Sequence, residues 1–179
     1  MDAAGTSDER TQLTDDGRGA LFDAWYRSQY PRVVRVLTVV GGDFEAASDA
    51  AAEAFARALS QWDRVSAMSS PSGWTYAVAL NLLRRRQRRA RLERLAALGP
   101  LPPPPVAEDH LYLWEAVRSL PPRQRTAIVL HYVADLPQEQ VAKIMGVAPG
   151  TVAATLHAAR GKLRALLDDQ DNDGMTTHD

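Results

Sequence analysis

Residues 136–152 read LPQEQVAKIMGVAPGTV, and this stretch decides the fold of the second half of the chain. It carries apolar side chains at helical spacing, and Ala142 is small where two helices would cross closely. Gly146 follows where a turn between helices needs a positive φ, and Pro149 is suited to the first position of a second helix. The pattern predicts a helix-turn-helix, with a generic pair of helices as the less favoured alternative.

The outward positions of the second helix determine what such a motif would bind. In a helix-turn-helix the first turns of this helix enter the major groove of DNA. Here those positions hold only hydroxyl and methyl groups, at Thr151, Ala153, Ala154 and Thr155. None is a charged or amide side chain, so these positions exclude bidentate readout of guanine or adenine. His157 and Arg160 lie farther along and are expected to hold phosphate, which predicts weak binding led by the DNA backbone.

Charge is distributed unevenly along the chain. Lys and Arg total 21 against 22 Asp and Glu, a net charge of -1. Residues 84–94 nevertheless read RRRQRRARLER, and both ends of the chain are acidic. Phosphate attraction depends on local rather than net charge, so this run indicates a surface that faces a polyanion. A solvated helix face is the alternative interpretation.

Composition excludes several classes of protein. The chain has 179 residues, 45% of them apolar, and no cysteine, which rules out disulfides and thiol chemistry. No apolar run approaches the ~20 residues of a membrane helix. The acidic first twenty residues do not resemble a secretory signal, and the four histidines are dispersed. We therefore expect a cytoplasmic protein that is not an enzyme and has no metal, no cofactor, no catalytic residue and no membrane contact.

The remaining patterns divide the chain into two small helical domains. Residues 1–17 are expected to be a disordered acidic tail, and 18–97 the first domain. Within it Pro31 is expected to interrupt the first helix, Gly41–Gly42 to end it, and Ser70 with Pro71 to begin a later one.

The proline-rich residues 98–109 predict an extended linker. Residues 110–168 form the second domain, in which Tyr132 is expected to be internal, and 169–179 an acidic tail. No strand pattern is present, so the predicted class is all-α.

Five stretches together resemble the bacterial extracytoplasmic-function (ECF) sigma factors of the sigma-70 family. They are the helix-turn-helix and residues 30–33, 53–58, 73–82 and 120–125, and the resemblance covers about residues 18–167. It implies a protein that binds core RNA polymerase and directs it to a promoter. The first domain would then bind and melt the -10 element, and the second would bind the -35 element.

The resemblance also implies roles for individual residues. The helix docking on the coiled coil of the largest polymerase subunit would use Asp49, Glu53, Phe55 and Arg57. Loop 63–72 would hold a flipped -10 base, and contacts to -10 DNA would come from Arg64, Ser69, Ser70, Trp74, Asn81, Arg84, Arg85 and Arg88. Contacts to the -35 element would come from Arg123, Arg125, Thr151, Ala153, Ala154, Thr155, His157 and Arg160. The flap of the second-largest polymerase subunit and an anti-sigma protein are further implied partners.

The chain departs from the family pattern at three sites. Ala52 stands where a glutamine usually precedes the docking glutamate, arginines follow Leu83 where an acid is usual, and Ala153 and Ala154 replace polar residues. These departures leave a second hypothesis open, namely a sigma-like regulator or antagonist that binds polymerase or DNA without directing initiation.

Overall fold

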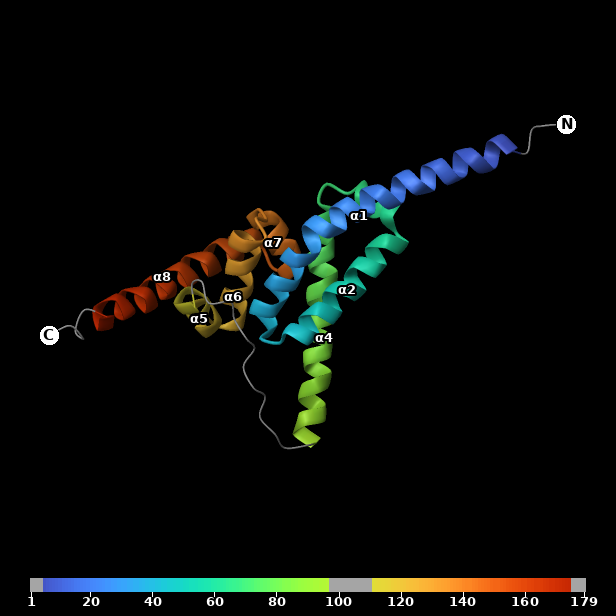
Figure 1. Cartoon of the computed structure of the whole chain (residues 1–179). Helices are drawn as coiled ribbons and strands as arrows, with labels where there is room; N and C mark the ends of the chain where they lie inside the picture. Colours follow the sequence, from blue (N-terminus) through green and yellow to red (C-terminus); the bar gives the residue numbers. More distant parts are fainter. Residues whose placement is uncertain (1–4, 97–110, 175–179) are drawn as a thin grey trace.

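The computed structural model describes residues 5–96 and 111–174, and the side chains within 17–90 and 113–168. All regular structure in these ranges is helical (Figure 1), which confirms the predicted all-α class. The first half contains α1 (Gly5–Gly41), α2 (Phe44–Ser60), α3 (Trp62–Ser66) and α4 (Pro71–Ala96). The second half contains α5 (Leu111–Ser119), α6 (Pro122–Ile128), the π-helical turn η1 (Val129–Val133), α7 (Gln138–Met145) and α8 (Pro149–Gly174).

Helix α2 packs between α1 and α4 through a face of small residues. Its fully buried alanines are Ala47, Ala50, Ala51, Ala54 and Ala58. Methyl side chains allow neighbouring helix backbones to approach closely, which multiplies dispersion contacts. The alanine-rich sequence of α2 is therefore a requirement of packing.

An aromatic cluster closes the other end of the first half. Phe22 lies edge-on to Trp62 with ring centroids 5.2 Å apart, and Tyr26 meets Phe55 in the same way at 5.1 Å. Edge-to-face pairs add roughly 0.5–1.5 kcal/mol each beyond the burial of area. The cluster anchors α1 on α2 and α3.

Two predicted helix boundaries are confirmed, and Asp43 supplies a further helix cap. Gly42 has φ +78°, and Gln87 Nε2 donates to the Gly41 carbonyl at 2.9 Å, so α1 ends at the two glycines. Asp43 caps α2 by accepting from the Ala46 amide at 3.0 Å. Ser70 Oγ likewise accepts from the Gly73 amide at 3.0 Å at the start of α4.

Helix α1 begins at Gly5, within residues 1–17, the segment predicted to be a disordered acidic tail. One expectation about this helix is wrong. Pro31 lies inside α1 and does not interrupt it. Its ring removes one backbone hydrogen bond, and burial of Val33, Val36 and Leu37 just beyond outweighs that loss.

At the other end of the chain, α8 extends to Gly174, into the expected tail 169–179. The predicted linker 98–109 lies outside the described residues.

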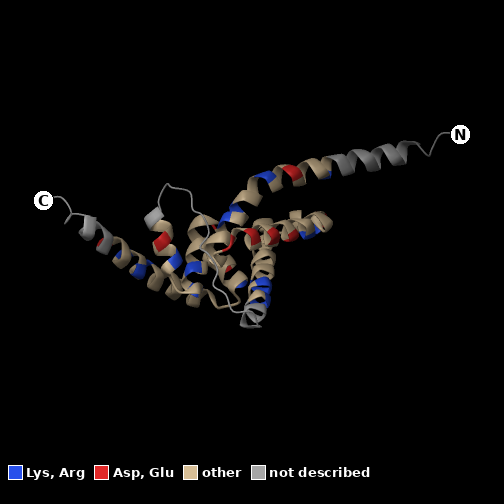
Figure 2. Cartoon of the chain, turned by 60° about the horizontal axis from the view of Figure 1, so that its bottom comes forward, with Lys and Arg blue, Asp and Glu red and all other residues tan. Residues whose placement is uncertain are grey.

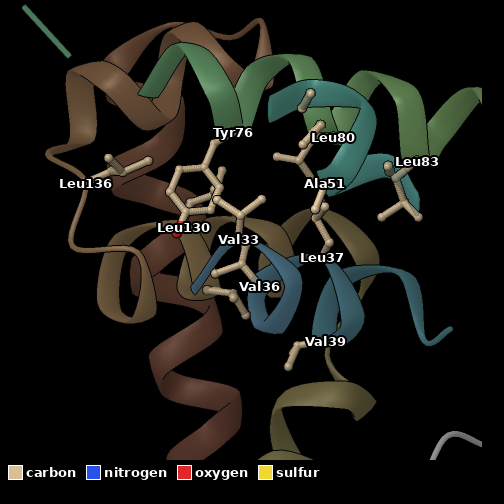
Figure 3. Packing of buried hydrophobic residues seen from close by; sticks show 14 of the residues in the cluster. Val33, Val36, Leu37, Val39, Ala51, Tyr76, Leu80, Leu83, Leu130 and Leu136 are labelled. Atoms are coloured by element: carbon tan, nitrogen blue, oxygen red, sulfur yellow. The ribbon is translucent and has the colours of Figure 1, made fainter. Parts of the chain in front are cut away.

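The two halves share one hydrophobic core rather than forming separate bundles. Helix α1 packs against η1, α5 and α6, and α4 packs against α7. Figure 3 shows Val33 of α1, Tyr76 of α4, Leu130 of η1 and Leu136 gathered in one group, and all four are at least 94% buried. The two predicted helical domains are both present, and they pack against each other through this common core.

Candidate nucleic-acid interface

The helix-turn-helix forms as predicted. Gly146 ends α7 in the left-handed conformation (φ +67°, ψ +40°), and the Val147 amide donates to the Ala142 carbonyl at 3.1 Å. Val141 and Val152 are fully buried where α7 meets α8. A residue with a Cβ at position 146 would be strained, so glycine fixes the angle between the two helices.

The first turns of α8 present an outer surface without charge. Thr151, Ala153 and Ala154 are exposed. Thr155 is half-buried, and its hydroxyl donates to the Thr151 carbonyl at 2.7 Å, which engages its only hydrogen. This surface offers methyl groups and one free hydroxyl to a DNA groove.

Cationic side chains lie farther along α8 and on α6. His157, Arg160 and Arg123 are exposed. Arg160 Nη1 donates to the Tyr132 hydroxyl at 3.2 Å. The expectation that Tyr132 is internal is wrong, because its side chain is 54% exposed and lies beside Arg160. A helical period of 3.6 assigned it to the core, but the π-helical turn changes which way the side chains point.

Arg125 does not join these exposed cations. Its Nη1 donates to the Arg118 carbonyl at 2.6 Å, and its Nε is buried without a hydrogen-bond partner among the described residues. Burial lowers the pKa of Arg125, and the nearby charge of Arg118 adds to the effect. Arg125 therefore connects α6 to α5, and only Arg123 of this pair projects into solvent.

Helix α4 carries a continuous cationic face. Asn81, Arg84, Arg85 and Arg88 are exposed, and their spacings of three and four place them on one side of the helix. Figure 2 shows the basic part of α4 projecting from the body of the molecule. Trp74, one turn into the helix, is half-buried and packs against the core.

The segment before α4 comprises α3 and the turn that follows it. Ser69 is exposed, and Arg64 Nη1 donates to Gln61 Oε1 at 3.3 Å. Arg18 of α1 pairs with Asp63 of α3 at 3.1 Å, which attaches α3 to α1. Ser70 Oγ donates to Oε1 of Gln140, a residue of α7, at 2.8 Å.

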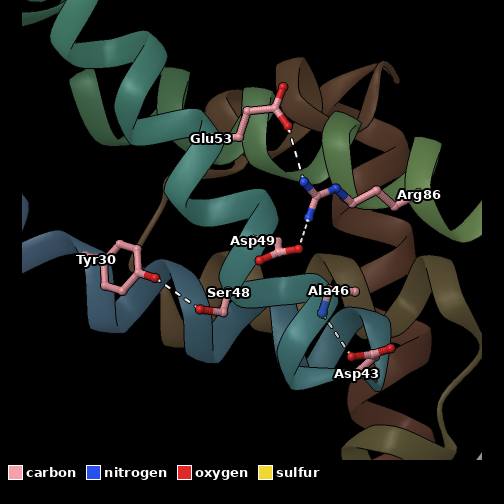
Figure 4. A network of polar contacts seen from close by, with 7 residues as sticks. All are labelled: Tyr30, Asp43, Ala46, Ser48, Asp49, Glu53 and Arg86. Carbon is pink, nitrogen blue, oxygen red and sulfur yellow. Dashed lines mark hydrogen bonds and ion pairs between the residues drawn. The ribbon is translucent and has the colours of Figure 1, made fainter.

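An acidic face of α2 lies beside the cationic helix, as Figure 4 shows. Asp49 is exposed, Glu53 is half-buried, and Arg86 of α4 approaches both, at 2.9 Å and 3.4 Å. Glu53 also pairs with Arg57 one turn later. Phe55 was expected to contact polymerase, but its side chain is only 2% exposed and belongs to the aromatic cluster. Its ring therefore holds α2 in place inside the protein.

No group of His, Cys, Asp and Glu side chains among the described residues is arranged to hold a metal ion. No described helix has the length and apolarity needed to cross a membrane.

Comparison with known proteins accounts for this combination of a helix-turn-helix and an arginine-rich helix. Residues 17–93 match the sigma-70 region 2 family and residues 110–163 match the sigma-70 region 4 family. The ECF RNA polymerase sigma factor EcfG of Rhodopseudomonas palustris is 33% identical over 135 residues, covering 72% of this chain and 75% of that protein. SigW of Bacillus subtilis, also named an ECF RNA polymerase sigma factor, is 29% identical over 147 residues, covering 72% and 79%.

Solved structures show the same fold. The sigma factor RpoE of Bartonella quintana, in complex with the anti-sigma factor NepR, superposes with a TM-score of 0.74 at 21% identity, covering 82% of this chain and 96% of that one. CnrH in complex with the cytosolic domain of CnrY gives a TM-score of 0.56 at 22% identity, covering 83% and 88%. The chain belongs to the sigma-70 family of RNA polymerase sigma factors. Within that family it is an ECF sigma factor, a protein that recognises promoters.

Proposed function

We propose that this sigma factor divides its work between two surfaces of its first half, the acidic face of α2 and the cationic face of α4. The acidic face, Asp49 and Glu53, docks with the adjoining Arg57 on core RNA polymerase at the coiled coil of the largest subunit. The cationic face binds the -10 element. The observation that carries the proposal is that opposite charges lie on two helices, α2 and α4, that pack against each other. DNA held on α4 is then placed directly beside the polymerase held on α2.

The chemistry of α4 suits melted DNA. Arg84, Arg85 and Arg88 neutralise phosphates, and Asn81 can hydrogen-bond a base edge with both its donor and its acceptor. An unstacked base needs a pocket that compensates for lost stacking. We assign this pocket to the segment from Asp63 to Ser72, which comprises most of α3, the turn after it and the start of α4. Trp74 is half-buried and packs against the core, so we assign it mainly to packing. Arg64, Ser69 and Ser70 form the loop side of this contact.

The helix-turn-helix supplies a weaker contact at the -35 element. The exposed Thr151, Ala153 and Ala154 fit a groove lined with thymine methyl groups. Thr155 contacts the DNA with its exposed part, and the cations Arg123, His157 and Arg160 bind the phosphate backbone of the DNA. Sequence selection would then rest chiefly on the -10 element.

The same function sets the partners and the location. Holoenzyme assembly takes place in the cytoplasm, with a second contact between the -35 half and the flap of the second-largest polymerase subunit. One of the solved structures named above contains the anti-sigma factor NepR, which motivates an anti-sigma partner here as well. Catalysis belongs to the polymerase, so this chain acts as a non-enzymatic subunit.

A run-off transcription assay tests the proposal. Purified core polymerase and genomic fragments are combined with and without this protein, and start sites are mapped. We expect new discrete transcripts whose upstream sequences align. Binding to core polymerase without transcripts would contradict initiation and point to an antagonist, and absence of core binding would contradict the role of α2.

A further inference from the structure

The contact between the loop before α4 and the helix-turn-helix joins two surfaces that the proposed function assigns to different DNA elements. Ser70 Oγ accepts from the Gly73 amide and donates its hydrogen to Gln140 Oε1 at 2.8 Å. Ser70 belongs to the loop that would hold the flipped -10 base, and Gln140 lies on the first helix of the -35 motif. A carboxamide carries an acceptor and a donor side by side, as the edge of a nucleobase does.

Gly73 provides the space for this contact. It is buried, and its backbone needs no positive φ, so conformational freedom does not explain the glycine. A Cβ at this position would stand 3.0 Å from Gln140 Oε1 and 2.7 Å from Ser70 Oγ. The missing side chain therefore leaves a recess beside the Ser70 hydroxyl, and the Gln140 amide fills it.

We propose that Gln140 occupies the place of the unstacked -10 base, so that the closed arrangement of the two halves and the binding of melted DNA exclude each other. The inference rests on the proposed function, because it takes the base pocket to lie at Ser70 and Gly73. It implies that the pocket offers a hydroxyl donor and selects a base through an acceptor atom. In the closed protein the acceptor is Gln140 Oε1.

The dimensions of a promoter require the closed arrangement to open. Elements roughly 25 base pairs apart are separated by about 85 Å at the 3.4 Å rise of DNA. The 14 residues between α4 and α5 can span at most roughly 50 Å when fully extended, and this length is the reach available to the two halves when they separate. Helices α4 and α7 in direct contact cannot serve both elements, so the Ser70–Gln140 contact is lost when the promoter is bound.

The shared core contains a feature that favours this opening. Tyr76 is 1% exposed and packs beside Leu130 and Leu136 (Figure 3), yet its hydroxyl has no hydrogen-bond partner among the described residues. A buried hydroxyl without a partner opposes closure, because water would satisfy it once the halves separate. The closed arrangement is thus held by apolar contact and by Gln140, and weakened by Tyr76.

The test compares Gln140→Ala with Gln138→Ala, a change of the same chemistry on the same helix at a half-buried residue. Because the chain has no cysteine, Ala56→Cys and Ala165→Cys, both at exposed positions, accept a donor and an acceptor dye. Energy transfer between the dyes reports the separation of the two halves. The DNA probe is a fluorescent single strand that carries the -10 sequence mapped by the run-off assay.

We expect Gln140→Ala to lower energy transfer and to bind the strand on the order of 3- to 10-fold more tightly, the effect of one lost competing hydrogen bond. The strand itself should lower energy transfer in the unmodified protein. Gln138→Ala should change neither readout. Equal affinity of both variants, or weaker binding by Gln140→Ala at unchanged helix content, would overturn the proposal.

The two readouts also separate this proposal from the proposed function. If no form binds the strand, the assignment of the -10 face is wrong. Energy transfer then still decides whether Gln140 holds the halves together, and unchanged transfer in Gln140→Ala would refute that role.

Discussion

The cationic face of α4 leads to a quantitative prediction about salt. We expect replacement of Arg84, Arg85 and Arg88 by alanine to weaken binding to -10 DNA and to reduce its dependence on ionic strength. All three side chains are exposed on one side of the helix, so each can neutralise a phosphate. Each lost contact lowers the slope of log affinity against log salt by about 0.7 on single strands and about 0.9 on duplex.

Three lost contacts should therefore lower the slope by about 2 to 3. Between about 50 mM and about 200 mM salt, the unmodified holoenzyme should then lose roughly 20- to 40-fold more affinity than the variant. The assay is fluorescence anisotropy of a promoter fragment with a pre-melted -10 segment, titrated with holoenzyme at several salt concentrations. Open-complex formation should fall in parallel.

A matched control removes the same charge from another surface. Arg27, Arg32 and Arg35 are exposed on α1, and their joint replacement by alanine also changes the net charge by three. We expect this control to leave the salt slope nearly unchanged. An equal fall in slope for both triple variants would show that only net charge matters, and an unchanged slope for the α4 variant would refute the assignment of the -10 face.

Three further predictions concern the core and α8. Phe55→Ala should destabilise the protein by about 3–5 kcal/mol, since it empties the aromatic cluster, and a thermal melt that shifts by only one or two degrees would contradict its burial. Burial raises the pKa of Tyr76 to about 12 from 10.0, so the contribution of Tyr76 to stability should be constant below pH 10 and fall as the pH rises toward 12. Tyr76→Phe should remove that fall and raise stability near neutral pH by about 1 kcal/mol, measured by urea unfolding. Ala154→Arg should strengthen binding to -35 duplex and steepen its salt slope by about 0.9, and no change in slope would show that this face of α8 lies away from phosphate.

The features that the sequence predicted correctly depend on local chemistry. Gly146 needs its positive φ whatever surrounds it, and Ser70 caps α4 through a backbone amide three residues away. Residues of this kind, which begin or end helices, alternate with apolar residues at helical spacing. This alternation predicted the helices of both halves. The resemblance to sigma factors, confirmed by comparison, rested on the order of these short segments.

The features that the sequence did not predict depend on contacts between distant residues. Pro31 marks a break by its own chemistry, but α1 passes through it because both halves pack against the valines that follow. The family resemblance assigned Phe55 to polymerase docking, and the aromatic rings from α1 show that its side chain points inward. No sequence pattern near Gln140 predicts its contact with Ser70, since the two residues are 70 positions apart.

The bridge from Arg86 to Asp49 and Glu53 has a consequence for how the holoenzyme assembles. The same carboxylates that we assign to polymerase docking now hold Arg86 against α2. A polymerase that takes over these carboxylates releases a fourth guanidinium next to the DNA face of α4. Binding energies linked in this way are reciprocal. Bound DNA should therefore raise the affinity of this protein for polymerase by the same factor by which bound polymerase raises its affinity for DNA. Recruitment to a promoter would then be cooperative even though the two ligands touch different helices.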